Sequence, residues 1–178
     1  MHMRRHSLVV GAKTVYNVIM YEQADYKPLI HALVGHFGER LKMVVLFGSQ
    51  SRGDARPDSD HDIFVVVESL PQDPLARQRE VMMPLLPVLL RLPERLSVIA
   101  KTPQDLLGDL TPLVVDVCTD GIGLYGGVTF NALQSKVLQA LSDAGLRRRR
   151  LAGTWMWMFP VLPEKDWAVT WEGYHERV

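Results

Sequence analysis

Residues 46–64 read LFGSQSRGDARPDSDHDIF, and this stretch carries most of the information about fold and chemistry. A short β-rich run, Met43 to Phe47, stops at the turn Gly48-Ser49, and a second run, Ile63 to Val67, follows a polar loop. The second run is apolar on both faces, which is typical of an interior strand. The stretch therefore predicts two strands joined by a polar connection.

The residue types at the two ends of this connection favour binding of a metal-bound phosphate. Glycine has no Cβ, so backbone at Gly48 can approach a phosphate, and backbone amides and the Ser49 hydroxyl can donate to its oxygens. After ten intervening residues come Asp60 and Asp62, which alternation along a strand places on one face. Magnesium prefers oxygen ligands and commonly takes one or two carboxylates plus substrate phosphates. The sequence thus predicts a site for a nucleoside triphosphate and Mg²⁺.

The same pattern resembles the minimal nucleotidyltransferase family of the DNA polymerase β-like superfamily. The family hallmark is Gly-Ser, ten residues, then Asp-x-Asp. The elements Ser51-Arg52-Gly53 and Pro57-Asp58-Ser59 are also similar to the family, and Asp120 to Tyr125 resembles its glycine-leucine-tyrosine element. The resemblance covers about residues 22–127.

The resemblance implies an α+β fold with a small mixed β-sheet flanked by helices. It also implies that Asp60 and Asp62 are catalytic and hold Mg²⁺, while Gly48, Ser49 and Arg52 bind the nucleotide. The implied reaction moves a nucleoside monophosphate, AMP from ATP, to a hydroxyl of a protein or small molecule. By analogy with small bacterial relatives, the implied protein partner is a HEPN-type toxin modified by its antitoxin.

One position departs from the family pattern. Active members usually carry a third carboxylate on the third core strand, here expected at Leu96 to Ala100, and this chain has Ser97 there. A hydroxyl is a poor magnesium ligand and no general base at neutral pH. The alternative interpretation is therefore a catalytically weak or inactive antitoxin-like protein that binds nucleotide or a partner.

Hydrophobic periodicity and turn residues predict the surrounding elements and the domain organisation. We expect an extension over 1–21, a nucleotidyltransferase-like domain over 22–127, and a C-terminal helix and tail packing on it over 128–178. Helices are expected at Glu22 to Leu41, at Pro71 to Leu92 (whole or hinged at Pro84 and Pro87), from Thr102, at Leu113 to Leu124, and at Phe130 to Ala144 with Gly145 as cap.

Two segments of the tail allow more than one interpretation. The four arginines Arg147 to Arg150 suit a solvated helix end, although they are also able to meet RNA or an acidic partner. If Trp155 to Phe159 form a strand, Trp155, Trp157 and Phe159 share one face. Such a face either covers the core or forms an interface for a homo-oligomer or partner.

Composition limits the classes of protein. Twenty basic and twenty acidic residues give a net charge of zero in 178 residues, which weighs against a dedicated nucleic-acid binder. The single cysteine, Cys118, excludes an internal disulfide and is expected to be a buried small hydrophobe. The apolar stretch Val81 to Leu92 is broken by two prolines and an arginine, so we expect no membrane span and a cytoplasmic location.

Overall fold

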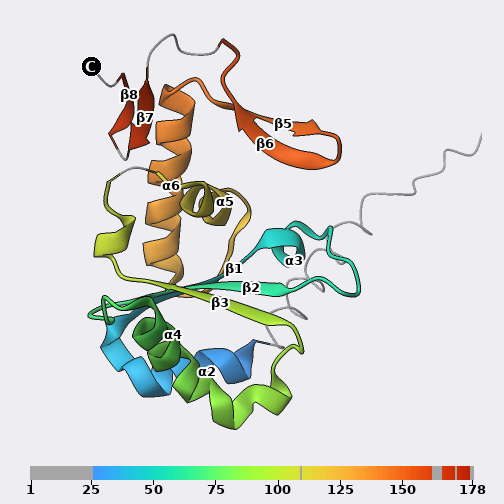
Figure 1. The fold of residues 1–178 in the computed structure, drawn as a ribbon, viewed down its shortest axis with the longest axis vertical. Helices are drawn as coiled ribbons and strands as arrows, with labels where there is room; N and C mark the ends of the chain where they lie inside the picture. Colours follow the sequence, from blue (N-terminus) through green and yellow to red (C-terminus); the bar gives the residue numbers. More distant parts are fainter. Residues whose placement is uncertain (1–25, 109, 162–165, 171, 177–178) are drawn as a thin grey trace, which may run out of the picture.

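A four-stranded mixed sheet forms the centre of the computed structural model, which describes residues 26–108, 110–161, 166–170 and 172–176 (Figure 1). The strand order is β3-β2-β1-β4. The strands are β1 (Leu41–Phe47), β2 (His61–Val67), β3 (Leu96–Lys101) and β4 (Ile122–Tyr125). β1 is antiparallel to β2 and β4, whereas β2 and β3 are parallel. The fold is therefore α+β with a mixed sheet, as the sequence predicts.

Both faces of the sheet are covered, which explains the continuous apolar runs of the two inner strands. Alternate residues of β2 point to opposite sides: Ile63 and Val65 join one cluster of buried side chains, and Phe64 and Val66 join the other. All four side chains are at most 2% exposed. The interior position predicted for this strand is thus confirmed.

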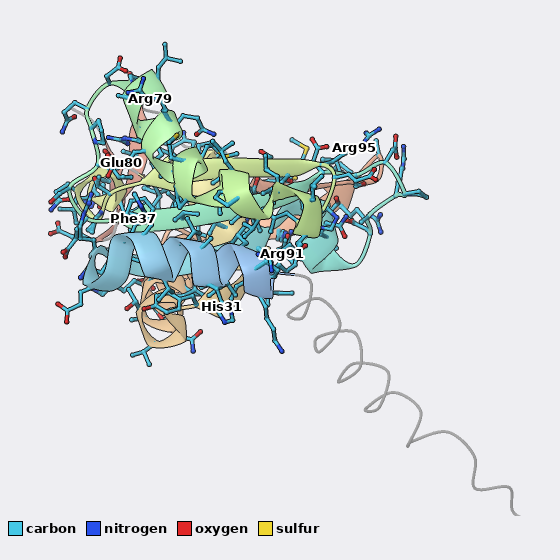
Figure 2. All side chains as sticks on the ribbon, turned by 90° about the horizontal axis from the view of Figure 1, so that it is seen from below. His31, Phe37, Arg79, Glu80, Arg91 and Arg95 are labelled. Atoms are coloured by element: carbon cyan, nitrogen blue, oxygen red, sulfur yellow. The ribbon has the colours of Figure 1, made fainter. Side chains whose placement is uncertain are left out.

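One face is covered by α2 (Lys27–Phe37), α4 (Pro74–Met82) and the 3₁₀ segment η2 (Met83–Arg91) (Figure 2). α2 ends at Phe37, before the expected Leu41, because Gly38 has φ +53° and the short 3₁₀ turn η1 (Gly38–Arg40) leads into β1. Residues 22–25 of that predicted helix lie outside the described residues. The Pro71 to Leu92 helix is two pieces, and Pro84 and Pro87 fall in the 3₁₀ part because proline cannot donate to an α-helical ladder.

The opposite face is covered by α5 (Pro112–Asp120) and α6 (Gly127–Asp143) (Figure 1). The helix predicted for Leu113 to Leu124 is wrong at its end, because the chain leaves α5 at Gly121 and Ile122 to Tyr125 form β4 beside β1. A Cβ on Gly121 would lie 2.2 Å from the Val117 carbonyl oxygen and 2.7 Å from Val45 Cγ1. Close packing on β1 therefore decides where this helix ends.

α6 ends as the sequence predicts. Gly145 has φ +70°, and its N–H donates to the Ser142 carbonyl, while the N–H of Leu146 donates to Leu141. This pair of hydrogen bonds is the Schellman arrangement that glycine favours after a helix.

A single 3₁₀ turn, η3 (Gln104–Leu106), replaces the helix expected from Thr102. Its start is capped reciprocally: the Asp105 carboxylate accepts from the Thr102 N–H at 2.8 Å, and the Thr102 hydroxyl accepts from the Asp105 N–H at 3.2 Å. Arg77 Nη1 lies 2.6 Å from the same carboxylate. Burial raises the pKa of Asp105, but the Thr102 hydrogen bonds and the Arg77 charge outweigh it and leave the pKa below its usual value.

We expect Asp105→Ala to lower the free energy of unfolding by about 1 kcal/mol at neutral pH, the usual cost of a lost cap. A lowered pKa means that the carboxylate stabilises the fold above the pKa of the unfolded chain, and that this stabilisation disappears as pH falls through the folded pKa. Urea unfolding of the wild type and the variant should therefore show that the difference between their free energies of unfolding becomes smaller from neutral to acidic pH. A difference that stayed constant would contradict an ionic role.

Two hairpins complete the described chain. β5 (Arg147–Leu151) pairs with β6 (Thr154–Met158), and β7 (Trp167–Thr170) pairs with β8 (Gly173–Glu176). The arginine run is thus a strand, and its interpretation as a helix end is wrong. Trp157 packs against the core cluster beside α5 and α6, whereas Trp155 remains 44% exposed. Within the described residues, no helix is long and apolar enough to span a membrane.

Candidate functional site

The predicted site residues meet at one edge of the sheet, where β1 ends and β2 begins. The chain passes from Phe47 into the short helix α3 (Gly48–Arg52), which contains Gly48 and Ser49, both partly buried. Asp62 is paired with Phe47 of β1 on one side and with Ser97 of β3 on the other. Asp60 lies just before β2 and is exposed. The fold therefore brings the Gly-Ser turn and the aspartate pair together.

Gly48 lies so close to the Asp62 carboxylate that any side chain at this position would force the carboxylate to move. Its φ is +76°, and a Cβ there would lie 2.5 Å from Asp62 Oδ2. The absence of a side chain thus allows the carboxylate to lie directly against the turn. This contact joins the two halves of the sequence motif.

The loop before β2 is held by hydrogen bonds to Arg95, the residue before β3, and to itself. The His61 N–H donates to the Arg95 carbonyl at 2.6 Å, and Arg95 Nη1 donates to the Asp58 carbonyl at 2.7 Å. Within the loop, the Arg56 N–H donates to the Ser59 hydroxyl at 2.8 Å. These bonds fix the start of β2 and hence the position of both aspartates.

Asp60 and Asp62 form an acidic pair that suits a hard cation. Burial raises the pKa of Asp62, a hydrogen bond from Ser97 opposes this shift, and the negative charge of Asp60 adds to it. Two carboxylates that repel each other at an open edge provide oxygen ligands of the kind that Mg²⁺ prefers. The residues present therefore fit a magnesium ion bound together with phosphate oxygens.

Ser97 occupies the place where active relatives are expected to have a third acid. It is the direct partner of Asp62 in the parallel register, and its hydroxyl hydrogen-bonds the Asp62 carboxylate. Among the described residues, no group of three or more His, Cys, Asp or Glu side chains is placed to hold a metal ion. Within the described part of the chain, no third acid therefore joins Asp60 and Asp62 in a metal-binding group.

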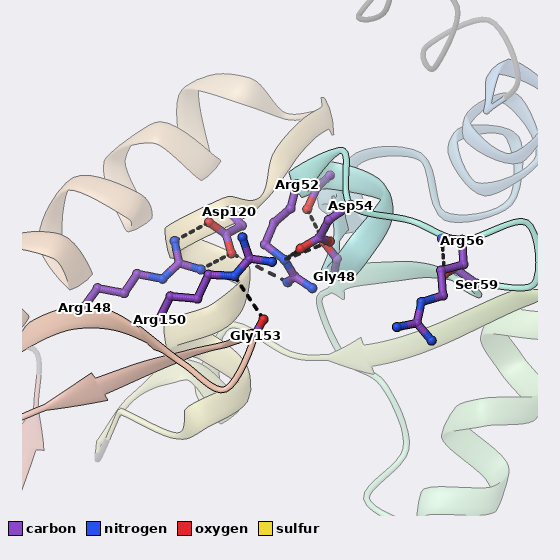
Figure 3. A network of polar contacts seen from close by, with 10 residues as sticks. Gly48, Arg52, Asp54, Arg56, Ser59, Asp120, Arg148, Arg150 and Gly153 are labelled. Atoms are coloured by element: carbon purple, nitrogen blue, oxygen red, sulfur yellow. Dashed lines mark hydrogen bonds and ion pairs between the residues drawn. The ribbon is translucent and has the colours of Figure 1, made fainter.

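Arg52, expected to meet a phosphate, takes part in a network of ion pairs (Figure 3). Its guanidinium lies 3.3 Å from Asp54 and 3.7 Å from Asp120, the last residue of α5. Asp120 also accepts a two-point contact from Arg148 of β5, with Nη1 2.7 Å from Oδ1 and Nη2 paired with Oδ2. We call Arg52, Asp120 and Arg148 the Asp120 cluster.

Asp120 and Arg148 were missed as functional neighbours by sequence reasoning. Asp120 falls inside the helix expected at Leu113 to Leu124, and Arg148 lies 28 residues further on. The local signals were the family-like segment that starts at Asp120 and the arginine run. Its partner is fixed by packing of the hairpin and not by spacing along the chain.

His61, which separates the two aspartates, has a structural role. One ring nitrogen is hydrogen-bonded to the buried Tyr26 hydroxyl at the start of α2, and the other lies 3.3 Å from the Gln50 amide nitrogen. It thereby ties α2 and α3 to the first residue of β2.

Cys118 is fully buried in α5, and burial raises the pKa of its thiol to about 12. A thiol with this pKa is no nucleophile at neutral pH, so the prediction of a small buried hydrophobe is confirmed.

Cavities of about 800, 440, 340 and 420 Å³ in the described chain have no Asp60 or Asp62 in their lining. The cavity of about 800 Å³ includes Lys42 and Met43 from the start of β1 and Val66 from the end of β2. It therefore lies at the end of the sheet away from the aspartate pair.

Comparison with known families assigns the chain to a class. The model of the nucleotidyltransferase domain family matches residues 32–121, which include β1, α3, β2, β3 and α5. The match thus spans half of the chain and the whole Gly-Ser and Asp-x-Asp constellation. The chain belongs to the nucleotidyltransferase domain family.

Two curated relatives come from Methanocaldococcus jannaschii, and both are named as candidate protein adenylyltransferases. The first is 33% identical over 84 residues, which is 47% of this chain and 57% of the relative. The second is 40% identical over 47 residues, 26% of this chain and 47% of the relative. The chain therefore spans only about half the length of each relative.

Solved structures with a partial likeness include a toxin–antitoxin crystal structure with AMP-PNP. It is 24% identical to this chain, with a TM-score of 0.48. The match covers 66% of this chain and 87% of that chain. A nucleotidyltransferase candidate from Sulfolobus solfataricus is 18% identical with a TM-score of 0.42, covering 61% of this chain and 83% of that one.

Proposed function

We propose that the chain is a magnesium-dependent nucleotidyltransferase that moves a nucleoside monophosphate, AMP from ATP, to a hydroxyl acceptor. The observation that carries this proposal is the contact between Gly48 and Asp62, with Asp60 beside them at the same sheet edge. A turn open to phosphate on one side and a carboxylate pair on the other suit one triphosphate and its cation.

Each residue of the candidate site has a role in the proposed reaction. Asp60 and Asp62 hold Mg²⁺, which when bound neutralises charge on the phosphate oxygens. Ser49 and the backbone amides at the start of α3 donate to the β- and γ-phosphates. Arg52 lies at the other end of this short helix and donates to a phosphate oxygen. The acceptor hydroxyl releases its proton to solvent and its oxygen attacks the α-phosphorus, the bond to the bridging oxygen breaks, and pyrophosphate leaves.

A protein is the acceptor we propose. Asp60 is exposed just before the start of β2, where a bulky acceptor can approach it. An open edge suits a hydroxyl carried on a protein surface. The names of the two curated relatives support the same choice. A HEPN-type toxin is the partner that the family resemblance suggests, and the product of the neighbouring gene is the first protein to test.

Ser97 supports a second candidate function, a protein that binds nucleotide or a partner but transfers slowly. The hydroxyl opposite Asp62 cannot take a proton from the acceptor at neutral pH, because alcohols are far too weak as bases. Binding of one magnesium–nucleotide by two carboxylates does not require an acid at that position. The two candidates therefore differ in turnover and agree in binding.

Ser97→Asp separates these candidates. If the protein is catalytically weak, we expect an added carboxylate next to Asp62 to raise turnover by about 100-fold, within the range that a general base contributes. Pyrophosphate release and labelling of the acceptor by ATP labelled at the α-phosphate measure it, with Ser97→Ala as the control that removes the hydroxyl without adding an acid. Robust turnover by the wild type, with no gain in Ser97→Asp, would exclude the weak-catalyst candidate.

A further inference from the structure

The β5–β6 hairpin has two chemically different faces. Cross-strand pairing places Arg148 opposite Trp157 and Arg150 opposite Trp155 on one face, which we call the inner face. The other face, the outer face, consists of Arg147, Arg149, Leu151, Met156 and Met158 with Thr154. Each face combines arginine with large apolar side chains.

The inner face is used within the chain. Arg148 joins Asp120 through two contacts, and its guanidinium carbon lies 4.7 Å from the centre of the Trp155 ring. Trp157 packs against the core cluster beside α5 and α6. Because Asp120 also contacts Arg52, the Asp120 cluster fixes the hairpin beside the helix that follows Gly48 (Figure 3). The hairpin is therefore held next to the nucleotide site.

The side chains of the outer face are partly or largely exposed. Leu151 is 45% exposed, Met156 48% and Met158 38%. Arg147 and Arg149 are exposed, and neither forms an ion pair with a carboxylate of the described residues. Two unpaired guanidinium groups beside three exposed apolar side chains give a surface with the composition of an interface core, in which arginine and methionine are enriched.

The chemistry of the outer face favours an acidic polypeptide over a nucleic acid. Proteins that bind single-stranded nucleic acid stack bases on exposed aromatic rings, but the aromatic side chains of this hairpin belong to the inner face. Trp157 packs against the core cluster, and Trp155, although 44% exposed, has the Arg148 guanidinium over its ring. The outer face instead offers thioether and aliphatic side chains, which pack on apolar protein side chains. Its arginines match carboxylates in planar two-point contacts.

We propose that the outer face of the β5–β6 hairpin docks an acidic, apolar segment of the protein that receives the nucleotide. This inference rests on the proposed function and deepens it by naming the surface and charge of the acceptor. The Asp120 cluster holds this surface beside the transfer site, so that a docked segment brings a neighbouring hydroxyl to the α-phosphate.

The test measures docking without nucleotide. Fluorescence anisotropy is recorded for short labelled peptides of matched length in which leucine alternates with glutamate, lysine or serine, and for a uridine oligonucleotide. The variant Arg147→Glu, Arg149→Glu reverses two charges of the outer face. Its matched control, Arg79→Glu, Arg91→Glu, reverses two exposed charges on α4 and at the end of η2, on the far side of the sheet (Figure 2).

We expect the glutamate–leucine peptide to bind the wild type and the control variant, and the hairpin variant to bind it at least about tenfold more weakly, because like charges oppose each other across an interface. Equal binding by both variants, no binding of this peptide, or stronger binding of the oligonucleotide would overturn the inference.

Calorimetric titration of magnesium–ATP into the same proteins distinguishes failure of the docking surface from failure of the proposed function. All three should bind nucleotide equally, because neither pair of arginines lies in the nucleotide site. Retained nucleotide binding with failed peptide binding would refute the docking surface alone. If the wild type did not bind magnesium–ATP, the proposed function would be refuted.

Discussion

The double variant Asp60→Asn, Asp62→Asn is expected to lose magnesium-dependent binding of ATP and GTP. Each substitution replaces a carboxylate by a neutral amide of almost the same shape, so the negative charge at the start of β2 disappears while the fold is kept. Changes in groups that only support metal ligands cost 10–100-fold in affinity, and removal of both ligands should cost more than about 100-fold. Calorimetric titration of nucleotide with and without magnesium measures the loss.

The variant should remain as stable as the wild type or become more stable. Burial and the charge of Asp60 both raise the pKa of Asp62, so the ionised pair opposes folding when no cation is bound. A control that removes two other negative charges, Asp58→Asn with Glu94→Gln, alters exposed side chains near the same edge and should bind nucleotide normally. Equal binding by the wild type and the Asp60, Asp62 variant would mean that the predicted metal ligands are wrong.

Gly48→Ala is expected to damage both binding and stability. The new Cβ would lie 2.5 Å from Asp62 Oδ2, closer than real contacts allow, and φ at this position is +76°. The backbone conformation alone costs an L-residue of order 1–3 kcal/mol. Since the Asp62 carboxylate has to move away from the turn, nucleotide affinity should fall together with the melting temperature.

Gly53→Ala distinguishes the backbone strain of Gly48→Ala from its clash with the Asp62 carboxylate. Gly53 ends α3 with φ +72°, and a Cβ there would have no neighbour within 4 Å. It therefore carries the backbone strain without the clash, so Gly53→Ala should lower the melting temperature and leave nucleotide binding nearly intact. If both variants bound nucleotide equally well, contact of Gly48 with Asp62 would have no role in the site.

The central part of the fold could be predicted because its signals are local. β2 reads as an interior strand from five consecutive apolar residues, and the structure buries all of them. Gly145 reads as a cap because only the left-handed backbone after α6 closes the two terminal hydrogen bonds. The helix ends at Phe37 and Asp120 were misplaced, since strand pairing of Leu41 and Ile122 overrode local helical periodicity.

The amino-acid sequence by itself determined the chemistry at one edge of the sheet: a glycine turn, two aspartates of one motif, and a serine where a third acid is expected. Residues within one motif are tied together by the geometry of a strand and its turn, so their spacing suffices. Only the tertiary structure decided that Arg148 meets Asp120 and that the four arginines form a strand. Those contacts join segments far apart in the chain, and they depend on which faces of the hairpin and α5 can be buried together.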